Sequence, residues 1–381
     1  MIFRILETRI AQEISDAKTA DRRFMELALA LGRRGLGRTA PNPAVGAVVV
    51  KDGVVVGRGW TAPGGRPHAE PQALAHAGEA ARGATLYVTL EPCSHHGKTP
   101  PCADAVIAAG IARVVSAIED PNLEVAGQGH ARLRAAGITV DVGLCAHEAA
   151  RDHAGHIRRV RDGRPHVILK LAVSQDDKIA AADQQRVDIT GAMAQRRVHL
   201  LRAQCDAILI GIGTARADDP LLTCRLPGMA PLSPTRVVLD THLRLKPSSR
   251  LAKTARQTPL WVMASASAEA PAAALLGAEG AQVIRLPATD AGVGLEPLLH
   301  ELARRGVTRL MVEGGARVAA SFVRAGLTDE IWLLRGPATI GADGVSALAA
   351  MPLSAITQSP DFRVRATETL DPDTLTIYER S

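Results

Sequence analysis

Residues 84–110 read ATLYVTLEPCSHHGKTPPCADAVIAAG, and this stretch decides the fold of the first half of the chain. ATLYVTL is an apolar run rich in β-branched residues, so it predicts a strand. CADAVIAAG predicts the helix that follows. Between them lies a loop with Cys93 and Cys102, and prolines stand next to both cysteines. A strand, a loop and a helix in this order are typical of an α/β layered domain.

Strands and helices continue to alternate on both sides of this stretch. Helices are predicted from residue 21 to about residue 34, from 67 to 78 and from 130 to 137, and strands at 44–50, 53–60, 113–120 and 138–143. The two runs joined by Lys-Asp-Gly indicate a hairpin. Residues 1–18 are expected to form a loose leader. The charged segment 155–166 contains Gly and Pro and predicts a junction.

After the junction the α/β pattern begins again. Strands are predicted at 166–174, 206–213, 235–240, 259–264, 281–287, 309–315 and 330–336, and helices at 192–204, 295–306 and 316–326. This order predicts a second α/β domain with a largely parallel sheet. The expected domains are residues 19–160 and residues 165–381.

Composition narrows the class of protein. The chain has 381 residues and a net charge of +6, which suits an anionic ligand or nucleic acid without choosing between them. Only four Phe, three Trp and two Tyr are present, which argues against a stacking platform for single-stranded nucleic acid. No secretory signal and no apolar run of about 18 residues is visible, so a cytoplasmic location is expected.

Thiols stay reduced in the cytoplasm, so Cys93 and Cys102 are predicted to be metal ligands or nucleophiles rather than a disulfide. The other cysteines, Cys145, Cys205 and Cys224, are expected to pack in the interior. His68 can join Cys93 and Cys102 as a third zinc ligand, which leaves one position for water, as in catalytic sites.

Glu70 lies two residues after His68, which is the spacing of the general acid–base in zinc deaminases. His68 and Glu70 fall at one helix start and Cys102 at another, where the positive end of the helix dipole favours thiolates. Three alternatives stay open. The cysteines can be buried small hydrophobes, His95 or His96 can complete a closed structural zinc site, or the chain can be a non-enzymatic zinc protein in which Glu70 has no role.

The stretch MVEGGARVAAS (311–321) marks a second site. A strand there runs into Gly314 and Gly315 and then into a helix, which is a geometry that binds phosphate. In parallel sheets, ligands lie at the carboxyl ends of the strands. A glycine pair after a strand is a weak signal alone, and a simple tight turn is the more common explanation. GxGxxG is absent, which excludes an ordinary Rossmann site.

HAE (68–70) and EPCSHHGKTPPC (91–102), with TAPNPAVGAVVV upstream, resemble the deaminase domain of the bifunctional riboflavin-biosynthesis deaminase/reductase family. Nucleoside and tRNA deaminases are similar but have two residues between the cysteines, and this chain has the eight residues SHHGKTPP. KLAVSQDDKIA (170–180), residues 196–225 and MVEGGARVAAS resemble the reductase domain of the same family. The resemblance implies an N-terminal cytidine-deaminase-like three-layer domain and a C-terminal dihydrofolate-reductase-like domain.

The resemblance also implies site residues. Asn42 is expected to contact the pyrimidine, and the loop with Ser94, His95, His96, Lys98 and Thr99 is expected to help hold the ribose phosphate. The positions implied for the NADPH site are Ala172, Thr214, Asp218, Thr241, Gly315, Ala316 and Arg317. Those implied for the reductase substrate are Arg202, Leu222, Arg225 and Glu313, of which the two arginines suit a phosphate.

The chain departs from the family pattern in two places. Residues 175–178 read Gln-Asp-Asp-Lys where the family commonly has Leu-Asp-Gly-Lys/Arg. Arg186 and Asp188 stand where a substrate-contacting Ser and a cofactor-contacting Trp are common. Asp188 removes a stacking surface and adds negative charge, while Arg186 is expected to meet the substrate phosphate.

The expected function is therefore bifunctional. Zinc-dependent deamination of 2,5-diamino-6-(ribosylamino)-4-pyrimidinone 5'-phosphate would be followed by NADPH-dependent reduction of the ribosyl group to ribityl. The expected cofactors are Zn²⁺ and NADPH. The expected partner is the phosphorylated pyrimidine, with no nucleic acid and no membrane, and the chain is expected to be a homo-oligomer. The alternative is a nucleic-acid or nucleoside base deaminase with an accessory domain.

Overall fold

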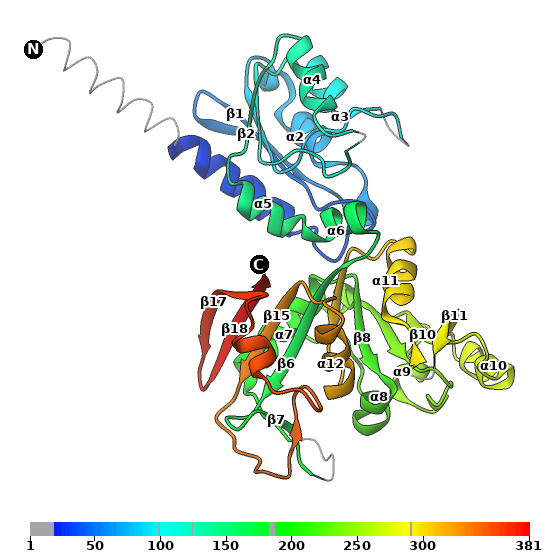
Figure 1. Cartoon of the computed structure of the whole chain (residues 1–381). Coiled ribbons are helices and arrows are strands. Elements are labelled where there is room, and N and C mark those ends of the chain that lie inside the picture. The colour runs from blue at the N-terminus through cyan, green and yellow to red at the C-terminus, as the bar shows by residue number, and fades with distance from the viewer. Residues whose placement is uncertain (1–18, 98–99, 124, 183–186, 290–291) are drawn as a thin grey trace, which may run out of the picture. The chain divides into compact units, whose positions relative to one another are not determined.

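The computed structural model describes residues 19–97, 100–123, 125–182, 187–289 and 292–381. The predicted leader, residues 1–18, lies outside them. The chain divides after Asp162 into two compact units, and each has its own sheet and its own core (Figure 1).

A five-stranded sheet forms the centre of the first unit, in the order β2-β1-β3-β4-β5. Its strands are β1 (Gly46–Lys51), β2 (Val54–Trp60), β3 (Thr85–Val88), β4 (Arg113–Ser116) and β5 (Thr139–Val142). β1 and β2 form the predicted antiparallel hairpin, while β3, β4 and β5 run parallel to one another. The carboxyl ends of the parallel strands therefore meet at one edge, where the stretch 91–102 begins.

Helices cover both faces of this sheet. They are the helix over 19–33, α2 (Ala69–Ala77), α3 (Cys102–Ala108), α4 (Gln128–Ala135), α5 (Ala146–Asp152) and α6 (Ala154–Asp162). In β1, Ala47 and Val49 pack with side chains of α2, α3 and α4, while Val48 and Val50 pack with the helix over 19–33 and with α5. This alternation, which follows from the strand pleat, gives the predicted three layers.

The second unit is built on a nine-stranded sheet in the order β11-β10-β9-β8-β14-β6-β15-β18-β17. The strands are β6 (His166–Val173), β8 (Ala207–Gly211), β9 (Thr235–Leu239), β10 (Leu260–Ser265), β11 (Gln282–Leu286), β14 (Arg309–Val312), β15 (Glu330–Arg335), β17 (Phe362–Leu370) and β18 (Asp373–Arg380). From β11 to β15 every neighbouring pair is parallel, as predicted.

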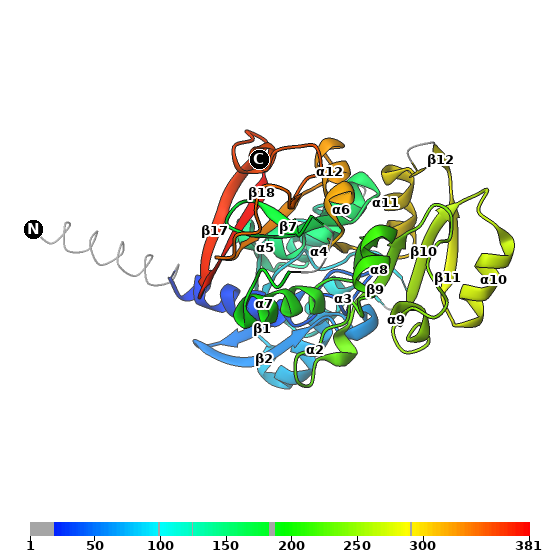
Figure 2. The ribbon, with the colours of Figure 1, turned by 90° about the horizontal axis from the view of Figure 1, so that it is seen from below.

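Two cores lie on opposite faces of the large sheet. On one face α11 (Leu295–Arg304) and α12 (Ala316–Arg324) pack against β6, and Phe322 is fully buried there. On the other face pack α7 (Ala192–Ala203), α8 (Ile212–Asp218), α9 (Arg250–Lys253) and α10 (Ala270–Ala278). Figure 2 shows α10 beside β11, at the edge of the sheet. The remaining elements are β7 (Lys178–Ala180), β12 (Ala288–Thr289), β13 (Gly292–Val293), β16 (Val345–Ser346) and α13 (Ser354–Thr357).

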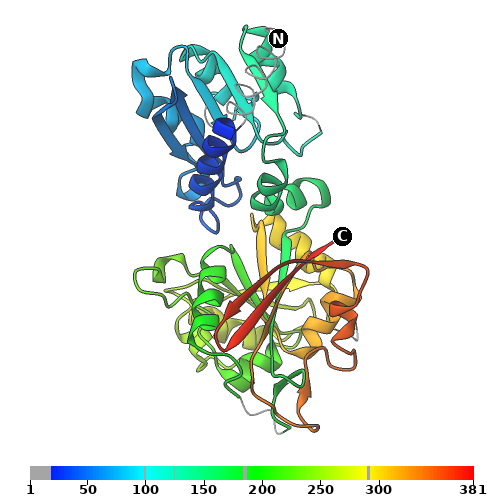
Figure 3. The same ribbon diagram turned by 90° about the vertical axis from the view of Figure 1, so that its left-hand side faces the viewer.

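The sequence expectation did not include several elements, among them α5, α8, α9 and α10, and two further differences stand out. The charged segment predicted as a junction is largely helical, because α6 runs through it and ends at the boundary between the units. The chain also ends in a long antiparallel hairpin, β17–β18, which pairs with β15 (Figure 3). β17 is an edge strand whose side chains are mostly polar and, apart from Phe362, not buried, so it carries little of the apolar signal that predicts strands.

Within the described residues, no helix is both long and apolar enough to cross a membrane.

Candidate active sites

The three predicted zinc ligands lie together in the first unit. His68 stands at the N-cap of α2, Cys102 is the first residue of α3, and Cys93 lies in the loop after β3. Their ligand atoms lie within 4.8 Å of one another. His68 Nδ1 is 3.3 Å from Cys102 Sγ and 3.8 Å from Cys93 Sγ. The backbone N–H of Cys102 donates to Cys93 Sγ at 3.3 Å.

Glycines in β2 let α2 approach closely enough to place His68. A Cβ at Gly57 would lie 2.2 Å from the carbonyl oxygen of Ala73, and one at Gly59 would lie 2.3 Å from that of Ala69. Any side chain at either position would push α2 away from the hairpin. The local sequence therefore sets the position of the helix start that carries His68 and Glu70.

The donor set fits zinc. Hydrogen bonds from Cys102 and His68 lower the pKa of Cys93 to about 4, so this sulfur is a thiolate. The hydrogen bond to Cys93 and burial raise the pKa of Cys102, because a second thiolate beside the first is unfavourable. A divalent cation removes that conflict, since it stabilises both thiolates at once. Two thiolates and one imidazole are a three-ligand zinc set of the catalytic kind.

Glu70 lies beside the ligands without belonging to the group. The residue is only 3 % exposed in the first turn of α2. Burial, with the nearby charge of Cys93, raises its pKa to about 7. A carboxyl group with a pKa near neutrality can both accept and donate a proton at physiological pH.

Asn42, also predicted for the deaminase site, lies next to the ligand residue His68, while the predicted residues His95 and His96 stay outside the ligand group. The Asn42 amide donates to the carbonyl of Gly65 at 2.8 Å and lies 3.4 Å from His68 Nε2. His95 and His96 are exposed and are not members of the ligand group, so the described residues form no closed four-ligand site. Lys98 and Thr99 lie outside the described residues.

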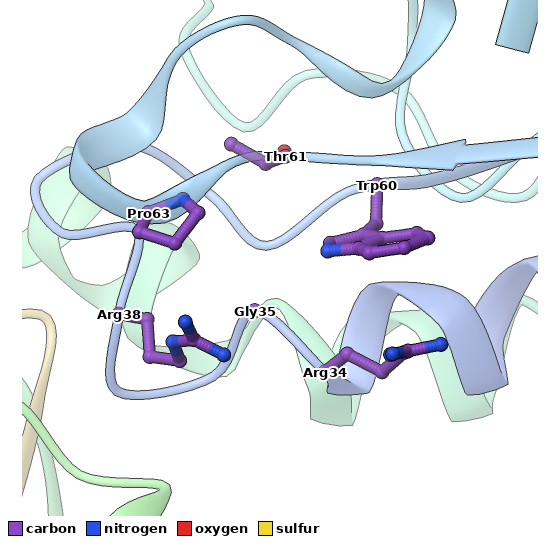
Figure 4. A pocket seen from close by; sticks show the side chains of 6 residues that line it. All are labelled: Arg34, Gly35, Arg38, Trp60, Thr61 and Pro63. Atoms are coloured by element: carbon purple, nitrogen blue, oxygen red, sulfur yellow. The ribbon is translucent and has the colours of Figure 1, made fainter. Parts of the chain in front are cut away.

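A basic pocket also opens in the same unit (Figure 4). It has a volume of about 160 Å³ and is lined by Arg34, Gly35, Arg38, Trp60, Thr61 and Pro63. The Arg34 guanidinium stacks on the Trp60 ring, 4.3 Å from its centroid. No predicted site residue lines this pocket.

In the second unit, Glu313 is the centre of a partly buried charge cluster. It follows β14 at the carboxyl edge of the sheet, and its carboxylate lies 2.7 Å from Arg202 Nη2 and 3.3 Å from Lys170 Nζ. Burial alone would raise the pKa of Glu313, but Arg202 and Lys170 outweigh it and hold the pKa at about 2. Lys170 was missed at the sequence level, because a lysine within a strand gives no signal of its own.

The predicted cofactor positions gather along the same edge. α8 follows β8 and α12 follows β14, and these two strands are neighbours, so two helix N-termini lie side by side. A Cβ at Gly315 would lie 2.9 Å from Thr214 Oγ1. Similarly, a Cβ at Gly292 would lie 3.0 Å from Thr241 Oγ1. The structure thus brings Thr214 and Gly315 together, with no room for a side chain at Gly315.

The remaining predicted positions lie near this edge. Ala172 is in the second half of β6, Ala316 and Arg317 begin α12, and Asp218 ends α8. Leu222 is buried and has a left-handed φ of 56°, which is unusual for leucine.

A histidine that the sequence analysis did not single out supports the loop carrying Arg225. The backbone N–H of Arg225 donates to His199 Nδ1 at 3.3 Å. Burial, with the charges of Arg202 and Arg225, lowers the pKa of His199 to about 4, so this side chain is neutral at pH 7. A single histidine on a helix has no sequence signature that distinguishes it from a surface histidine.

The chain departs from the family pattern at residues 175–178 and at residues 186–188, and the structure describes the first stretch in full and the second only in part. Asp176 anchors a neighbouring loop, because its carboxylate accepts from Ser174 Oγ at 2.6 Å and from the backbone N–H groups of Ile340 and Gly341 at 3.0 and 2.8 Å. Asp177 pairs with Arg335 at 2.7 Å. Asp188 is exposed, and Arg186 lies outside the described residues.

Comparison with known proteins agrees with both halves of this description. Residues 18–118 match the cytidine and deoxycytidylate deaminase zinc-binding region, and residues 165–376 match the RibD C-terminal domain. The riboflavin biosynthesis protein RibD of Escherichia coli is 40% identical over 364 residues, which are 93% of this chain and 97% of that protein. The RibD of Aquifex aeolicus is 39% identical and covers 94% of this chain and 98% of its own length.

Solved structures give the same result. Acinetobacter baumannii RibD (form 2) superposes with a TM-score of 0.83 at 34% identity and covers 96% of this chain and 100% of its own. A diaminohydroxyphosphoribosylaminopyrimidine deaminase/5-amino-6-(5-phosphoribosylamino)uracil reductase from Thermotoga maritima has the same TM-score, identity and coverage.

The fold and the two sites define a two-domain enzyme, with a zinc-binding deaminase domain followed by a reductase domain. Both predicted fold classes, cytidine-deaminase-like and dihydrofolate-reductase-like, are confirmed. The chain belongs to the RibD family of riboflavin biosynthesis proteins. The two domains imply zinc and a nicotinamide cofactor.

Proposed function

We propose that the first unit hydrolytically deaminates 2,5-diamino-6-(ribosylamino)-4-pyrimidinone 5'-phosphate, with His68, Cys93 and Cys102 as zinc ligands and Glu70 as proton carrier. The observation that carries the proposal is the three-ligand group next to a buried glutamate whose pKa is about 7. The solved Thermotoga maritima relative is named for this reaction, which supports the choice of substrate.

The side chains then have distinct roles. Zinc, when bound, supplies the Lewis acidity that makes water a nucleophile near neutral pH. Glu70 would accept a proton from that water and deliver it to the ring nitrogen. It would then accept the remaining proton of the hydroxyl added to the ring carbon and pass it to the departing ammonia, as the carbonyl forms. Asn42 orients the pyrimidine, and Ser94, His95, His96, Lys98 and Thr99 help to hold the ribose phosphate as hydrogen-bond donors.

Ammonia release from the phosphorylated diaminopyrimidinone tests this proposal. The zinc-loaded chain should release one ammonia per pyrimidine, and the same chain stripped of zinc should release none. If the zinc-loaded chain leaves this compound intact but deaminates an oligonucleotide or a nucleoside, the alternative base-deaminase function is correct.

For the second unit, we propose reduction of the ribosyl group of the deaminated product to a ribityl chain. A nicotinamide cofactor, when bound, supplies the hydride. Arg202, Arg225 and Arg186 bind the substrate phosphate, because a guanidinium offers paired donors to phosphate oxygens. Glu313 holds Arg202 in place, and Leu222 packs against the substrate. The cofactor is held by Ala172, Thr214, Asp218, Thr241 and the helix start at Gly315, Ala316 and Arg317.

The proposed cofactor is NADPH rather than NADH. Steady-state oxidation of each cofactor, measured by absorbance with pre-deaminated substrate, tests this choice. A lower KM for NADPH is expected, and an equal or lower KM for NADH would reject it.

The domain limits, 19–160 for the deaminase and 165–381 for the reductase, are proposed along with these activities. A cytoplasmic location is supported by the five cysteines, all of which are unpaired thiols. A homo-oligomer is also proposed, and light scattering on the purified chain would measure its mass.

A further inference from the structure

The eight-residue spacer between Cys93 and Cys102 raises a physical problem. When two residues separate a pair of cysteines, one turn of backbone sets the distance between the sulfurs. A longer loop has more conformational freedom, so its two ends need contacts from elsewhere to stay in register. Helix α4, which packs against the segment before Cys93, provides such contacts.

The first contact ties α4 to the residue two positions before Cys93. Glu91 is buried, and its carboxylate accepts four backbone N–H groups. Oε2 accepts from Asp120 at 3.0 Å and from Gly127 at 2.9 Å, and Oε1 accepts from Gly129 at 2.8 Å and from His130 at 3.3 Å. Three of these donors belong to the first turn of α4, so Glu91 caps that helix from a distant part of the chain.

The second contact is close packing of the same turn on the same segment. A Cβ at Gly129 would lie 2.1 Å from the carbonyl oxygen of Pro92, the residue directly before Cys93. α4 therefore rests on the backbone beside the first sulfur.

The third contact reaches both cysteine segments at once. Arg132, one turn further along α4, donates from Nη1 to the carbonyl of Ser94 at 3.3 Å. Its Nη2 lies 2.7 Å from Asp104 Oδ1 in the first turn of α3. Ser94 follows Cys93 and Asp104 lies two residues after Cys102, so one guanidinium joins the residues next to both ligands.

We propose that α4 is a brace for the metal site and that Arg132 is its positioning residue, fixing the segments of Cys93 and Cys102 relative to each other. Direct backbone bonds also join the two segments, including that from the N–H of Ala103 to the carbonyl of Cys93 at 3.1 Å. Arg132 adds a contact from outside the loop, and this contact limits the movements that would separate Cys93 from Cys102. The inference rests on the zinc site of the proposed function.

The test compares three full-length variants. Arg132→Met removes both contacts, and Arg132→Lys can keep only one of them. Arg134→Met is the matched control, because Arg134 is also an exposed arginine of α4 but donates to the carbonyl of Val140 in β5, away from the cysteines. The readouts are the rate of zinc release to a chromophoric chelator and the visible spectrum of the cobalt-substituted protein, in which the thiolate bands report on cysteine geometry.

Zinc release from Arg132→Met should be about threefold to tenfold faster than from wild type, at the low end of what is typical for residues that support metal ligands. Arg132→Lys should lie between them, and the thiolate bands of the cobalt protein should shift for Arg132→Met. Arg134→Met should stay within about twofold of wild type, as expected for one exposed contact.

Equal zinc release from wild type and Arg132→Met would overturn the inference while leaving the proposed function intact. Equal acceleration by Arg134→Met would overturn it too, because the effect would then be general loosening of α4. If wild type took up no zinc at all, the proposed deaminase site and the brace would both be wrong.

Discussion

The pKa values of Glu70, which is buried, and Glu313, which is largely buried, are shifted in opposite directions, because their neighbours differ. Burial, together with the charge of the neighbouring Cys93 thiolate, raises the pKa of Glu70 to about 7. Glu313 has Arg202 and Lys170 beside it, and these cations hold its pKa at about 2 in spite of burial. The first residue is suited to moving protons, and the second to holding a permanent negative charge.

Replacing Glu70 with Gln should abolish deamination and leave zinc binding unchanged. The amide keeps the size of the side chain but cannot carry the proton, so ammonia release should fall by roughly 10²- to 10⁴-fold. Zinc content, measured by atomic absorption, should remain that of wild type. A Glu70→Gln variant that still deaminated at the wild-type rate would remove Glu70 from the mechanism.

Glu313→Gln should destabilise the second unit in a pH-dependent way. The folded-state pKa of about 2 lies below the ordinary value of 4.5, so ionised Glu313 contributes stability that is fully present above pH 4.5 and is lost as pH falls towards 2. The contribution amounts to about 3 kcal/mol at pH 7 and about 1 kcal/mol at pH 3.

Urea unfolding of wild type and Glu313→Gln at both pH values measures this difference. The gap between the two proteins should shrink at the lower pH. A gap that is constant, or larger in acid, would show that the ion pairs with Arg202 and Lys170 do not set the stability of this cluster.

At the scale of elements, the second site depends on two helices that start at one edge of the sheet. β8 leads into α8 and β14 leads into α12, and the two strands pair in parallel. Helix N-termini placed side by side present unpaired N–H groups in the same direction, which favours an anionic ligand. Gly315 lets the two starts approach.

Gly315→Ala should therefore weaken cofactor binding. The new Cβ would lie 2.9 Å from Thr214 Oγ1, so one helix start must shift. An overpacking cost of about 1 kcal/mol corresponds to a roughly fivefold higher Kd for NADPH, which fluorescence titration would measure.

Gly277→Ala in α10 is the matched control, because a Cβ there meets no atom within 4 Å. It should bind NADPH as wild type does. Unchanged affinity in Gly315→Ala would place the cofactor elsewhere on the sheet edge.

At the scale of the whole molecule, each proposed site is built from one unit alone. All three zinc ligands and Glu70 precede residue 162, and the cluster around Glu313 follows residue 163. Each unit also has its own buried core. We therefore expect each chemistry to proceed without a side chain from the other unit.

Complementation between two inactive variants tests this independence. Glu70→Gln should lack deamination, and Arg202→Met should lack reduction. An equimolar mixture should convert the phosphorylated diaminopyrimidinone to the ribityl product with NADPH, as followed by chromatography. If the mixture made only the deaminated intermediate, the two steps would need both sites in one chain.

The amino-acid sequence by itself determined the α/β order of most strands and the residues that gather in the metal-ligand group. The alternating strands and helices, and the spacing of His68, Glu70, Cys93 and Cys102, are local patterns with few alternative explanations. The parallel sheet could be expected because strands separated by helices cannot pair as tight hairpins. The β17–β18 hairpin could not, because an exposed edge strand has a polar pattern.

Only the tertiary structure decided which distant residues meet. The pairing of Glu313 with Lys170, the support of Arg225 by His199, and the brace of Arg132 between Ser94 and Asp104 join residues far apart in the chain. Each of these residues is a common polar type on a helix or strand and has no distinctive sequence spacing. Their roles follow from charge and distance, and distance between remote residues is fixed only when the sheets and helices pack.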